Sequence, residues 1–386
     1  MTYLSRLAKL GGAKEGTQYQ YTAPAFSVPF TSAKFNDNIV PIRDESMRAN
    51  DVKLQGINQG PWTTSWEIEA NGYPDLLGYF LRAIIGPDTV TAGVSTTLAS
   101  NCVAGATSLS MTANPGSNSI IQINDATGIN LEWVQLGTVT GTGPYTCPVA
   151  TPATGTRFAH TAAGGAVLSQ STHVFTQNRT FTTVWPTYSF TTDDGQDQLG
   201  WPGCVMSELG IKIDPKGFIT CSPKYMGFPS ITEATFSYAA SAVQPVVGWG
   251  WTVSNPGAST RGLTMDITLK REIEAIQSSD GTQAPREIFP GPLELDGSYK
   301  AVYDNANDMA NFRQYLQTGT THLLTQPVTS GGQSLQIEMA KSGYTTGEAD
   351  LGSLYVSLSQ AVSAIGNTSD GGLTTVTLKN YVSTSY

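Results

Sequence analysis

Three histidines, His160, His173 and His322, are the side chains of this sequence best suited to move protons near neutral pH. Each lies in or beside a segment with the alternating pattern of a β-strand, and small residues after His160 predict a turn. The sequence contains no nucleophile elbow, phosphate-binding loop or dinucleotide-binding fingerprint that could work with them. We therefore expect these histidines to have structural roles.

Two acidic pairs have the residue types that glycoside hydrolases use, a general acid and a nucleophile or base. Asp193 and Asp194 precede a glycine, and this triplet is typical of a turn. Glu67 and Glu69 are two residues apart in the alternating segment WTTSWEIEA, so they share one face of a strand. Solvated charge explains both pairs, and no convergent carboxylate site is predicted.

The four cysteines, Cys102, Cys147, Cys204 and Cys221, have spacings that match neither a zinc site nor a two-cysteine redox motif. The sequence has no calcium-binding loop with ligands at alternate positions either. We expect the cysteines to be small buried apolar side chains. The sequence thus predicts no metal, no cofactor and no catalytic residue, and we expect that the chain is not an enzyme.

The composition indicates a β-protein whose surface is largely covered by partners. Charged residues make up 13% of the 386 residues, about half of the usual share of roughly 25%. Plentiful aromatic and β-branched residues argue against disorder. The formal net charge of −9 disfavours binding to DNA phosphates, but it is compatible with a conduit through which DNA slides. Neither a signal peptide nor an apolar membrane span is visible, so we expect the chain to be made in the cytoplasm.

Most segments alternate with period two and end at Gly, Pro, Asn or Asp, which predicts β-strands. Helical spacing occurs in YPDLLGYFLRAII and in NANDMANFRQYL, and each of these follows a long polar loop, a Gly-Pro pair and an alternating strand. This recurrence predicts two copies of one β-rich domain, each with a flanking helix. The features lie at 42–56, 60–61 and 73–85 in the first copy, and at 271–290, 291–292 and 305–316 in the second.

The first copy is interrupted after its helix. From about Pro87 to Ser171 the chain is rich in Gly, Ala, Thr and Ser and has almost no charge, while SLSMT, SIIQIN, EWVQLGTVT and YTCPVA still read as strands. A small all-β module inserted in a surface loop fits this pattern. The predicted domains are therefore 1–87 with 172–230 (including an N-terminal arm at 1–24), the inserted module at 88–171, and the second domain at 231–386.

The clearest local prediction is a hairpin within GCVMSELGIKIDPKGFITCSPKYMG. Asp214 to Gly217 fit a type I turn followed by a left-handed glycine. That register places Ile211 opposite Cys221 and Ile213 opposite Ile219, so one face is apolar and the other polar. It also separates Cys204 from Cys221, which argues against a disulfide between them. The hairpin residues are Ile211, Lys212, Ile213, Asp214, Pro215, Lys216, Gly217 and Ile219.

The order of these features resembles that of the tail tube proteins of long-tailed, non-contractile bacteriophages (siphoviruses). The segment NIVPIRDESMRANDVKLQGINQGPWTTSWEIEANGYPDLLGYFLRAIIG is similar to the family's opening strand, long loop, second strand and helix. The predicted hairpin resembles the family's central hairpin, and APREIFPGPLELDGSYKAVYDNANDMANFRQYL resembles a second such unit. The resemblance covers most of the chain outside the insert, which itself resembles accessory β-modules of virion proteins.

The resemblance implies a mainly β fold with two tandem tail-tube-type β-sandwich or barrel domains, each with one flanking α-helix, and a small all-β (immunoglobulin-like) insert. In the family, six such domains form a ring whose inner strands close into a barrel. Rings stack into a hollow tube, through which genomic DNA passes during ejection into the host. Two domains per chain imply a trimeric, pseudo-hexameric ring, and a hexamer of whole chains is the alternative.

The implied partners are other copies of the chain, the tape measure protein, and the tail terminator and baseplate proteins, with transient passage of DNA and no membrane span. We expect the protein in the virion tail after assembly in the host cytoplasm. The insert should point outward, because an inward module would block the channel. The candidate residues for ring-to-ring stacking lie in the two long loops and are Arg43, Asp44, Glu45, Arg48, Asp51, Lys53, Glu272, Glu274, Asp280, Arg286 and Glu287.

Two other functions stay open. A virion-displayed or secreted protein that binds carbohydrate or a host surface would need an exposed aromatic platform, and the insert has few aromatic residues, notably Trp133 and Tyr145. A glycoside hydrolase would need convergent carboxylates, and none can be located in the sequence.

Overall fold

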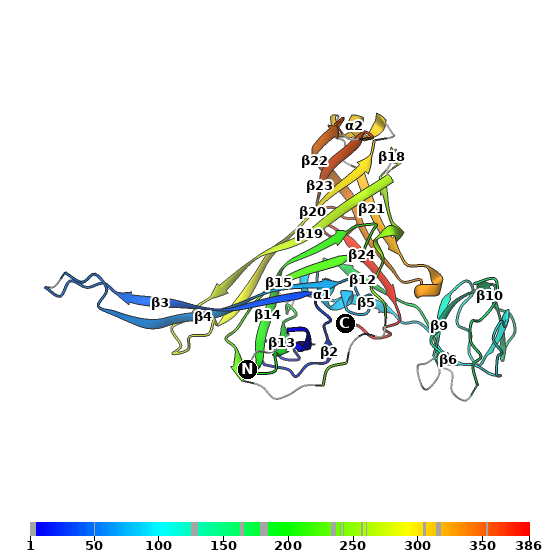
Figure 1. Ribbon diagram of the computed structural model, residues 1–386, viewed down its shortest axis with the longest axis horizontal. Helices are drawn as coiled ribbons and strands as arrows, with labels where there is room; N and C mark the ends of the chain where they lie inside the picture. Colours follow the sequence, from blue (N-terminus) through cyan, green and yellow to red (C-terminus); the bar gives the residue numbers. More distant parts are fainter. Residues whose placement is uncertain are drawn as a thin grey trace.

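Strands dominate the computed structural model of the chain (Figure 1). Most of them fall into two sets, with α1 (Leu77–Ile84) after the fourth strand of the first set and α2 (Ala306–Arg313) after the fourth strand of the second. The structure describes residues 5–49, 51–124, 130–162, 166–177, 184–232, 237–239, 241, 243–255, 258–259, 261–303, 306–313, 318–352 and 354–386.

The N-terminal strand set is built around two long hairpins. Within it β1 pairs with β2 and β13, β13 with β14, β14 with β15 and β16, β15 with β4, and β4 with β3. Its strands are β1 (Lys9–Lys14), β2 (Phe26–Ser27), β3 (Ser32–Asp44), β4 (Gly56–Asn71), β13 (Tyr188–Asp193), β14 (Gln198–Ile213), β15 (Thr220–Gly227) and β16 (Ile231–Thr232).

The C-terminal strand set has the same pattern of pairing. Within it β17 pairs with β18 and β21, β21 with β22, β22 with β23 and β24, β23 with β20, and β20 with β19. The sets therefore correspond strand by strand, β1–β4 to β17–β20 and β13–β16 to β21–β24. The strands are β17 (Trp251–Asn255), β18 (Ala258–Ser259), β19 (Arg261–Ile276), β20 (Glu287–Val302), β21 (Thr318–Thr325), β22 (Ser334–Asp350), β23 (Ser357–Ala364) and β24 (Thr375–Asn380).

Bulges at matching places extend this correspondence to single residues. Gly60-Pro61 forms a bulge on β4, directly before the residue that pairs with Ile39 of β3. Gly291-Pro292 forms a bulge on β20, directly before the residue that pairs with Arg271 of β19. Glycine and proline are typical at such sites because a bulge interrupts the ladder. Ile39 therefore corresponds to Arg271. The extra residues of the other matching bulges are Ser207 and Thr345, and 202–203 and 340–341.

The two sets are joined by the pairing of β14 with β19, which we call the internal seam. It produces one long sheet with the strand order β3-β4-β15-β14-β19-β20-β23-β22. Within the described residues, no further strand pairs with the outer edge of β3 or with residues 343–350 of β22. The long sheet thus ends in two open edges.

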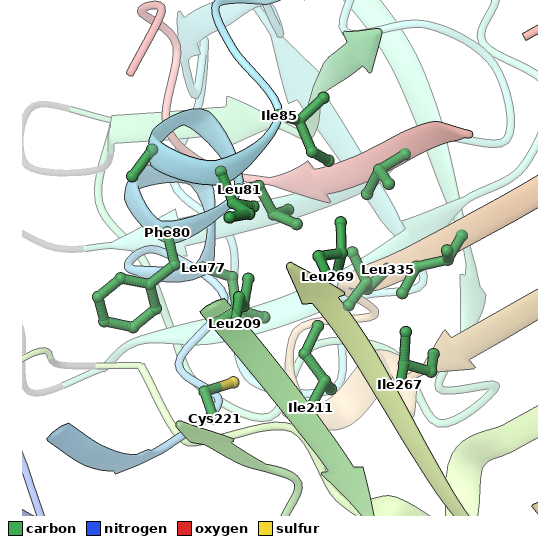
Figure 2. Close-up of a cluster of buried hydrophobic side chains, with 14 of the residues drawn as sticks. Leu77, Phe80, Leu81, Ile85, Leu209, Ile211, Cys221, Ile267, Leu269 and Leu335 are labelled. Carbon is green, nitrogen blue, oxygen red and sulfur yellow. The ribbon is translucent and has the colours of Figure 1, made fainter. Parts of the chain in front are cut away.

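Helix α1 covers the internal seam. Its apolar face points at side chains from both strand sets, so the sets share one hydrophobic core (Figure 2). Arg271 on β19 is 2% exposed, and its Nε donates to the carbonyl oxygen of Ile84 at 2.6 Å. A cation is favourable at the carbonyl end of a helix. The residues labelled in Figure 2 are Leu77, Phe80, Leu81, Ile85, Leu209, Ile211, Cys221, Ile267, Leu269 and Leu335.

Helix α1 is shorter than the sequence predicts. Of the segment 73–85, residues 74–76 form turns and α1 begins at Leu77, while Gly86 leaves the helix with a φ of 133°. Helix α2 lies within the predicted segment 305–316, of which 305 and 314–316 are outside the described residues. No helix among the described residues is long and apolar enough to cross a membrane. The short 3₁₀ helices are η1 (Ser5–Leu7), η2 (Gly248–Gly250) and η3 (Val328–Ser330).

The uncharged segment after α1 folds as a separate small sheet with its own core, at the right of Figure 1. Its stem strands β5 (Asp88–Thr91) and β12 (Ser171–Thr176) pair with each other, and β12 also pairs with β24. The four strands expected from the sequence, β7–β10, are confirmed. The small sheet contains β6 (Ser95–Thr97), β7 (Ser108–Met111), β8 (Ile120–Asn124), β9 (Glu132–Leu136), β10 (Tyr145–Thr151) and β11 (Ala166–Ser169).

The order of this sheet is β6-β11-β8-β9-β10-β7. A bridge between Leu98 and Met111 brings its two end strands together, so the described strands close on themselves. An immunoglobulin-like domain has two facing sheets instead. The module is all-β as expected, and its pairing differs from the immunoglobulin-like arrangement.

The prediction of two long polar loops was wrong in its extent. Strand β3 runs to Asp44 and β4 begins at Gly56, while β19 runs to Ile276 and β20 begins at Glu287. Charged and polar residues are frequent in both hairpin ends, so their composition resembles that of a loop although the backbone is paired. We call them the β3–β4 arm and the β19–β20 arm. Residues 9–14, in the expected N-terminal arm, likewise form β1.

Candidate assembly surfaces

The histidines that the structure describes are held in structural contacts. His160 Nε2 is 2.6 Å from Glu132 Oε1 inside the small sheet. His173 is buried, with Nδ1 2.7 Å from Asp88 Oδ2 and Nε2 donating to the carbonyl oxygen of Val382 at 2.9 Å. The side chain of His322 lies outside the described part of the chain. The first contact lies within the module, and the contacts of His173 join its stem to the C-terminal segment.

The acidic pairs are structural as well. Asp193 binds Lys9 Nζ at 2.9 Å and the backbone N–H of Gly195 at 3.0 Å, which closes the predicted turn. Glu67 and Glu69 lie on the exposed face of β4. Among the described residues, no group of three or more His, Cys, Asp or Glu could hold a metal ion.

The cysteines are free thiols. Burial raises the pKa of the Cys221 thiol to about 12, which keeps it protonated and unreactive. Cys204 and Cys147 are also buried, as expected from the sequence, whereas Cys102 is only half-buried.

The predicted hairpin has the predicted register, with Ile211 opposite Cys221. Gly217 N–H donates to the carbonyl oxygen of Asp214 at 3.1 Å to close the turn, but the prediction that Gly217 is left-handed was wrong, because its φ lies outside that region. The bulge at Ser207 shifts the register beyond it, so Cys204 lies beside Gly227 and not beside Phe228. The predicted apolar positions are buried and Lys212 and Lys216 are exposed. The same strand, β14, forms the internal seam with its other edge.

A row of alternating charges crosses the long sheet. Its members lie directly opposite one another on neighbouring strands, so they share the polar face of the sheet. Within the row, Lys224 Nζ is 2.9 Å from Glu208 Oε1, and this hydrogen bond raises the pKa of Lys224. From β3 to β20 this charge row is Lys34, Glu67, Lys224, Glu208, Lys270 and Glu294.

The rest of the polar face is acidic over the C-terminal strand set. In the N-terminal set, Lys212 and Glu69 add one charge of each sign. Lys212 lies opposite Asp266 across the internal seam. The further charged side chains of this face in the C-terminal set are Lys300, Asp296, Glu348 and Asp350.

The two open edges expose apolar side chains whose counterparts are buried. Counting from the matching bulges, Leu351 corresponds to Ile213 and Phe35 to Ile267. Leu351 is 77% exposed and Ile213 is 0% exposed. Phe35 is 44% exposed and Ile267 is 1% exposed. Each open edge therefore resembles one of the two strands of the internal seam without its partner strand.

The two arms place the candidate stacking residues differently. The β3–β4 arm projects far from the body (Figure 1), and its tip carries ion pairs between Arg48 and Asp44 and between Lys53 and Glu45. The carbonyl oxygen of Gln283 on the β19–β20 arm accepts a hydrogen bond from Trp62 N–H at 2.8 Å, at the base of the first arm. The other candidates lie on these arms, with Arg43 in β3, Glu272 and Glu274 in β19, Glu287 in β20, and Asp51, Asp280 and Arg286 between strands.

Sequence reasoning missed the apolar side chains of the β3–β4 arm. Met47 is fully exposed, and Val52 and Ile57 are also exposed. Apolar residues within a strongly polar segment are the signal that could have identified this surface.

Comparison with known proteins identifies the family of the chain. A family model described as phage tail tube protein matches residues 5–364. Comparison with curated proteins gives no match. The match covers the N-terminal strand set, both arms, the inserted module and the C-terminal strand set as far as β23. This chain belongs to the phage tail tube protein family, whose members are structural proteins of the virion tail and not enzymes.

Proposed function

We propose that the chain consists of two fused tube domains, residues 1–87 with 172–230 and residues 231–386, with the module at 88–171 inserted in the first. The observation that carries this proposal is the recurrence of strand pairing and of bulges between the two strand sets. Two unrelated strand–helix units would not be expected to have a Gly-Pro bulge at the same place in the same strand pair. A duplication of one ancestral domain accounts for it.

Three such chains would then form one ring of a siphovirus tail tube, with six pseudo-equivalent domains. Each chain brings a long sheet with an open edge at either end, and closing these edges on one another gives a continuous barrel without free edges. A hexamer of whole chains would double the number of domains and widen the bore. The trimer is therefore our proposal for the ring.

The polar face of the long sheet would line the bore. Its alternating charges and its acidic C-terminal part would let DNA slide during genome ejection without being held. The rings would stack through the β3–β4 arm, whose exposed tip combines ion pairs with apolar side chains. Assembly in the host cytoplasm would require the tape measure protein within the tube and terminator and baseplate proteins at its ends. The module would point outward.

Negative-stain microscopy of the purified full-length chain tests this function. We expect rings at low concentration and stacked tubes at higher concentration. A variant in which an Asn-Gly turn replaces residues 45–55 should form rings but not tubes. The matched variant, with residues 278–285 replaced, should retain more stacking because the first arm is intact. A wild-type chain that stays dispersed at all concentrations would refute the proposal.

A further inference from the structure

We propose that β22 of one chain pairs with β3 of a second copy in the register of the internal seam, with Asp350 directly opposite Lys34 of the second copy. This inference rests on the tube function proposed above and specifies its ring contact residue by residue. The partner is a second copy of this chain, because the internal seam already shows how a β22-type strand and a β3-type strand of this fold join.

The register follows from the correspondence between the strand sets. In the internal seam, Lys212 of β14 lies opposite Asp266 of β19. Strand β14 corresponds to β22 and β19 to β3, and the shared bulges align Lys212 with Asp350 and Asp266 with Lys34. The transferred register therefore makes Asp350 face Lys34 across the two chains. The neighbouring opposed pairs are Glu348 with Asn36, Ala349 with Phe35, and Leu351 with Ala33.

Charge complementarity supports this register. Lys34 is the first member of the charge row, and in the transferred register Asp350 takes the place just before it. The row then alternates in sign without interruption from Asp350 of one chain to Glu294 of the next. Both charges differ in sign from their counterparts, Lys212 and Asp266, and the attraction between them is kept. This indicates that Asp350 and Lys34 are in contact, because inheritance alone would keep the original signs.

Burial supports the same register. The exposed Leu351 and Phe35 correspond to Ile213 and Ile267, which the internal seam buries. Pairing of the open edges would place Leu351 and Phe35 at the new seam, next to Ala33 and Ala349. Removing apolar surface from water favours association in proportion to its area. One register thus pairs the opposite charges of the two edges and also buries their exposed apolar side chains.

The charges also disfavour the wrong partner edge. Two β22 edges brought together would oppose Glu348 and Asp350 with the same residues of the other copy. Like charges on facing strands are destabilising. Pairing of β22 with β3 is a head-to-tail contact, and such a contact closes into a ring when its rotation permits.

Cysteine cross-linking of the full-length chain tests the register. Asn36 and Glu348 are exposed, and residues directly opposite in an antiparallel pair have Cα atoms about 4.5–5.5 Å apart, within disulfide range. Under mild oxidation, Asn36→Cys/Glu348→Cys should form covalent multimers about tenfold faster than Asn38→Cys/Glu348→Cys or Lys34→Cys/Glu348→Cys, because a shift of two residues widens the separation to roughly 7–8 Å. The single variants measure cross-linking through native cysteines.

A charge exchange provides a second test. Lys34→Asp and Asp350→Lys should each raise the concentration needed for ring formation by about tenfold. Lys34→Asp/Asp350→Lys should assemble at a lower concentration than either single variant. Faster cross-linking of a shifted pair, or no recovery in the double variant, would overturn the register while rings remain. A wild-type chain that forms no rings would overturn the tube function itself, and the register with it.

Discussion

The internal seam and the open edges of the long sheet are made of corresponding strands, but they are covered differently. Helix α1 covers the internal seam, and Arg271 binds the carbonyl end of that helix. At the position corresponding to Arg271, the open edge has Ile39, which is 37% exposed. One seam is thus part of the fold, and we propose that its counterpart forms only when two chains associate. Rings should therefore come apart before the subunits unfold.

The difference between the two surfaces is largest when the corresponding apolar side chains, Ile213 and Leu351, are each truncated to alanine. Ile213→Ala should lower the free energy of unfolding by ~2–5 kcal/mol, because it leaves a cavity in the core. Leu351→Ala should change it by less than ~0.5 kcal/mol, because the side chain is exposed in the single chain. Urea unfolding of the dissociated subunit measures both. Equal losses in the two variants would show that the surfaces are not different in kind.

Arg271 provides a second contrast. Arg271→Ala should cost about 2–4 kcal/mol of subunit stability, because the carbonyl oxygens of Ile84 and Gly291 lose buried charged donors. The matched control is Ile39→Ala, for which we expect less than about 1 kcal/mol. Thermal unfolding of both variants makes the comparison. A cost for Ile39→Ala as large as that for Arg271→Ala would contradict the account.

The Gly-Pro bulges should behave alike if the two strand sets are equivalent. A Cβ at Gly60 would lie 2.5 Å from the carbonyl oxygen of Val40, and one at Gly291 would lie 2.9 Å from that of Glu272. Gly60→Ala and Gly291→Ala should each cost about 1–3 kcal/mol, because backbone atoms have to move. Denaturant unfolding measures the pair, and a neutral effect at either site would show that its bulge is not constrained.

The smallest expected effect concerns Asp88, whose contacts with His173 and Ser385 join the stem of the module to the C-terminal segment. Burial alone would raise the pKa of Asp88, but hydrogen bonds from His173 and Ser385 hold it below its ordinary value of 3.8. A carboxyl whose pKa is lowered in the folded state stabilises the fold when the pH is above its ordinary pKa. This contribution is lost as the pH falls through the lowered pKa. Arg82 also faces Asp88, at 3.6 Å.

Asp88→Asn should therefore reduce stability by about 1–2 kcal/mol at pH 7, and the gap to the wild type should narrow as the pH falls below 3.8. Denaturant titrations of both proteins at several pH values measure this gap. A gap that stays constant down to pH 2 would exclude the ionised carboxylate as its source.

Periodicity predicted most of the strands and both helices, and a change in composition predicted the separate small sheet after α1, because each leaves a local pattern in the chain. The Gly-Pro pairs of residues 60–61 and 291–292 also indicated the recurrence, since a bulge constrains residue type. The extent of the arms could not be predicted, because paired strands rich in charged and polar residues have the composition of loops. The charge row could not be predicted either, since Lys34 and Glu294 become members of one row only through pairing between strands that are distant in the sequence.

The symmetry of one assembled ring, measured by electron cryomicroscopy of the full-length protein, tests the central claim most directly. Two fused tube domains per chain predict threefold symmetry, with three outward modules and a pseudo-sixfold inner barrel. Each ring should contain three copies of the internal seam and three of the seam between β22 and β3. True sixfold symmetry of whole chains, with six modules around the ring, would contradict the account.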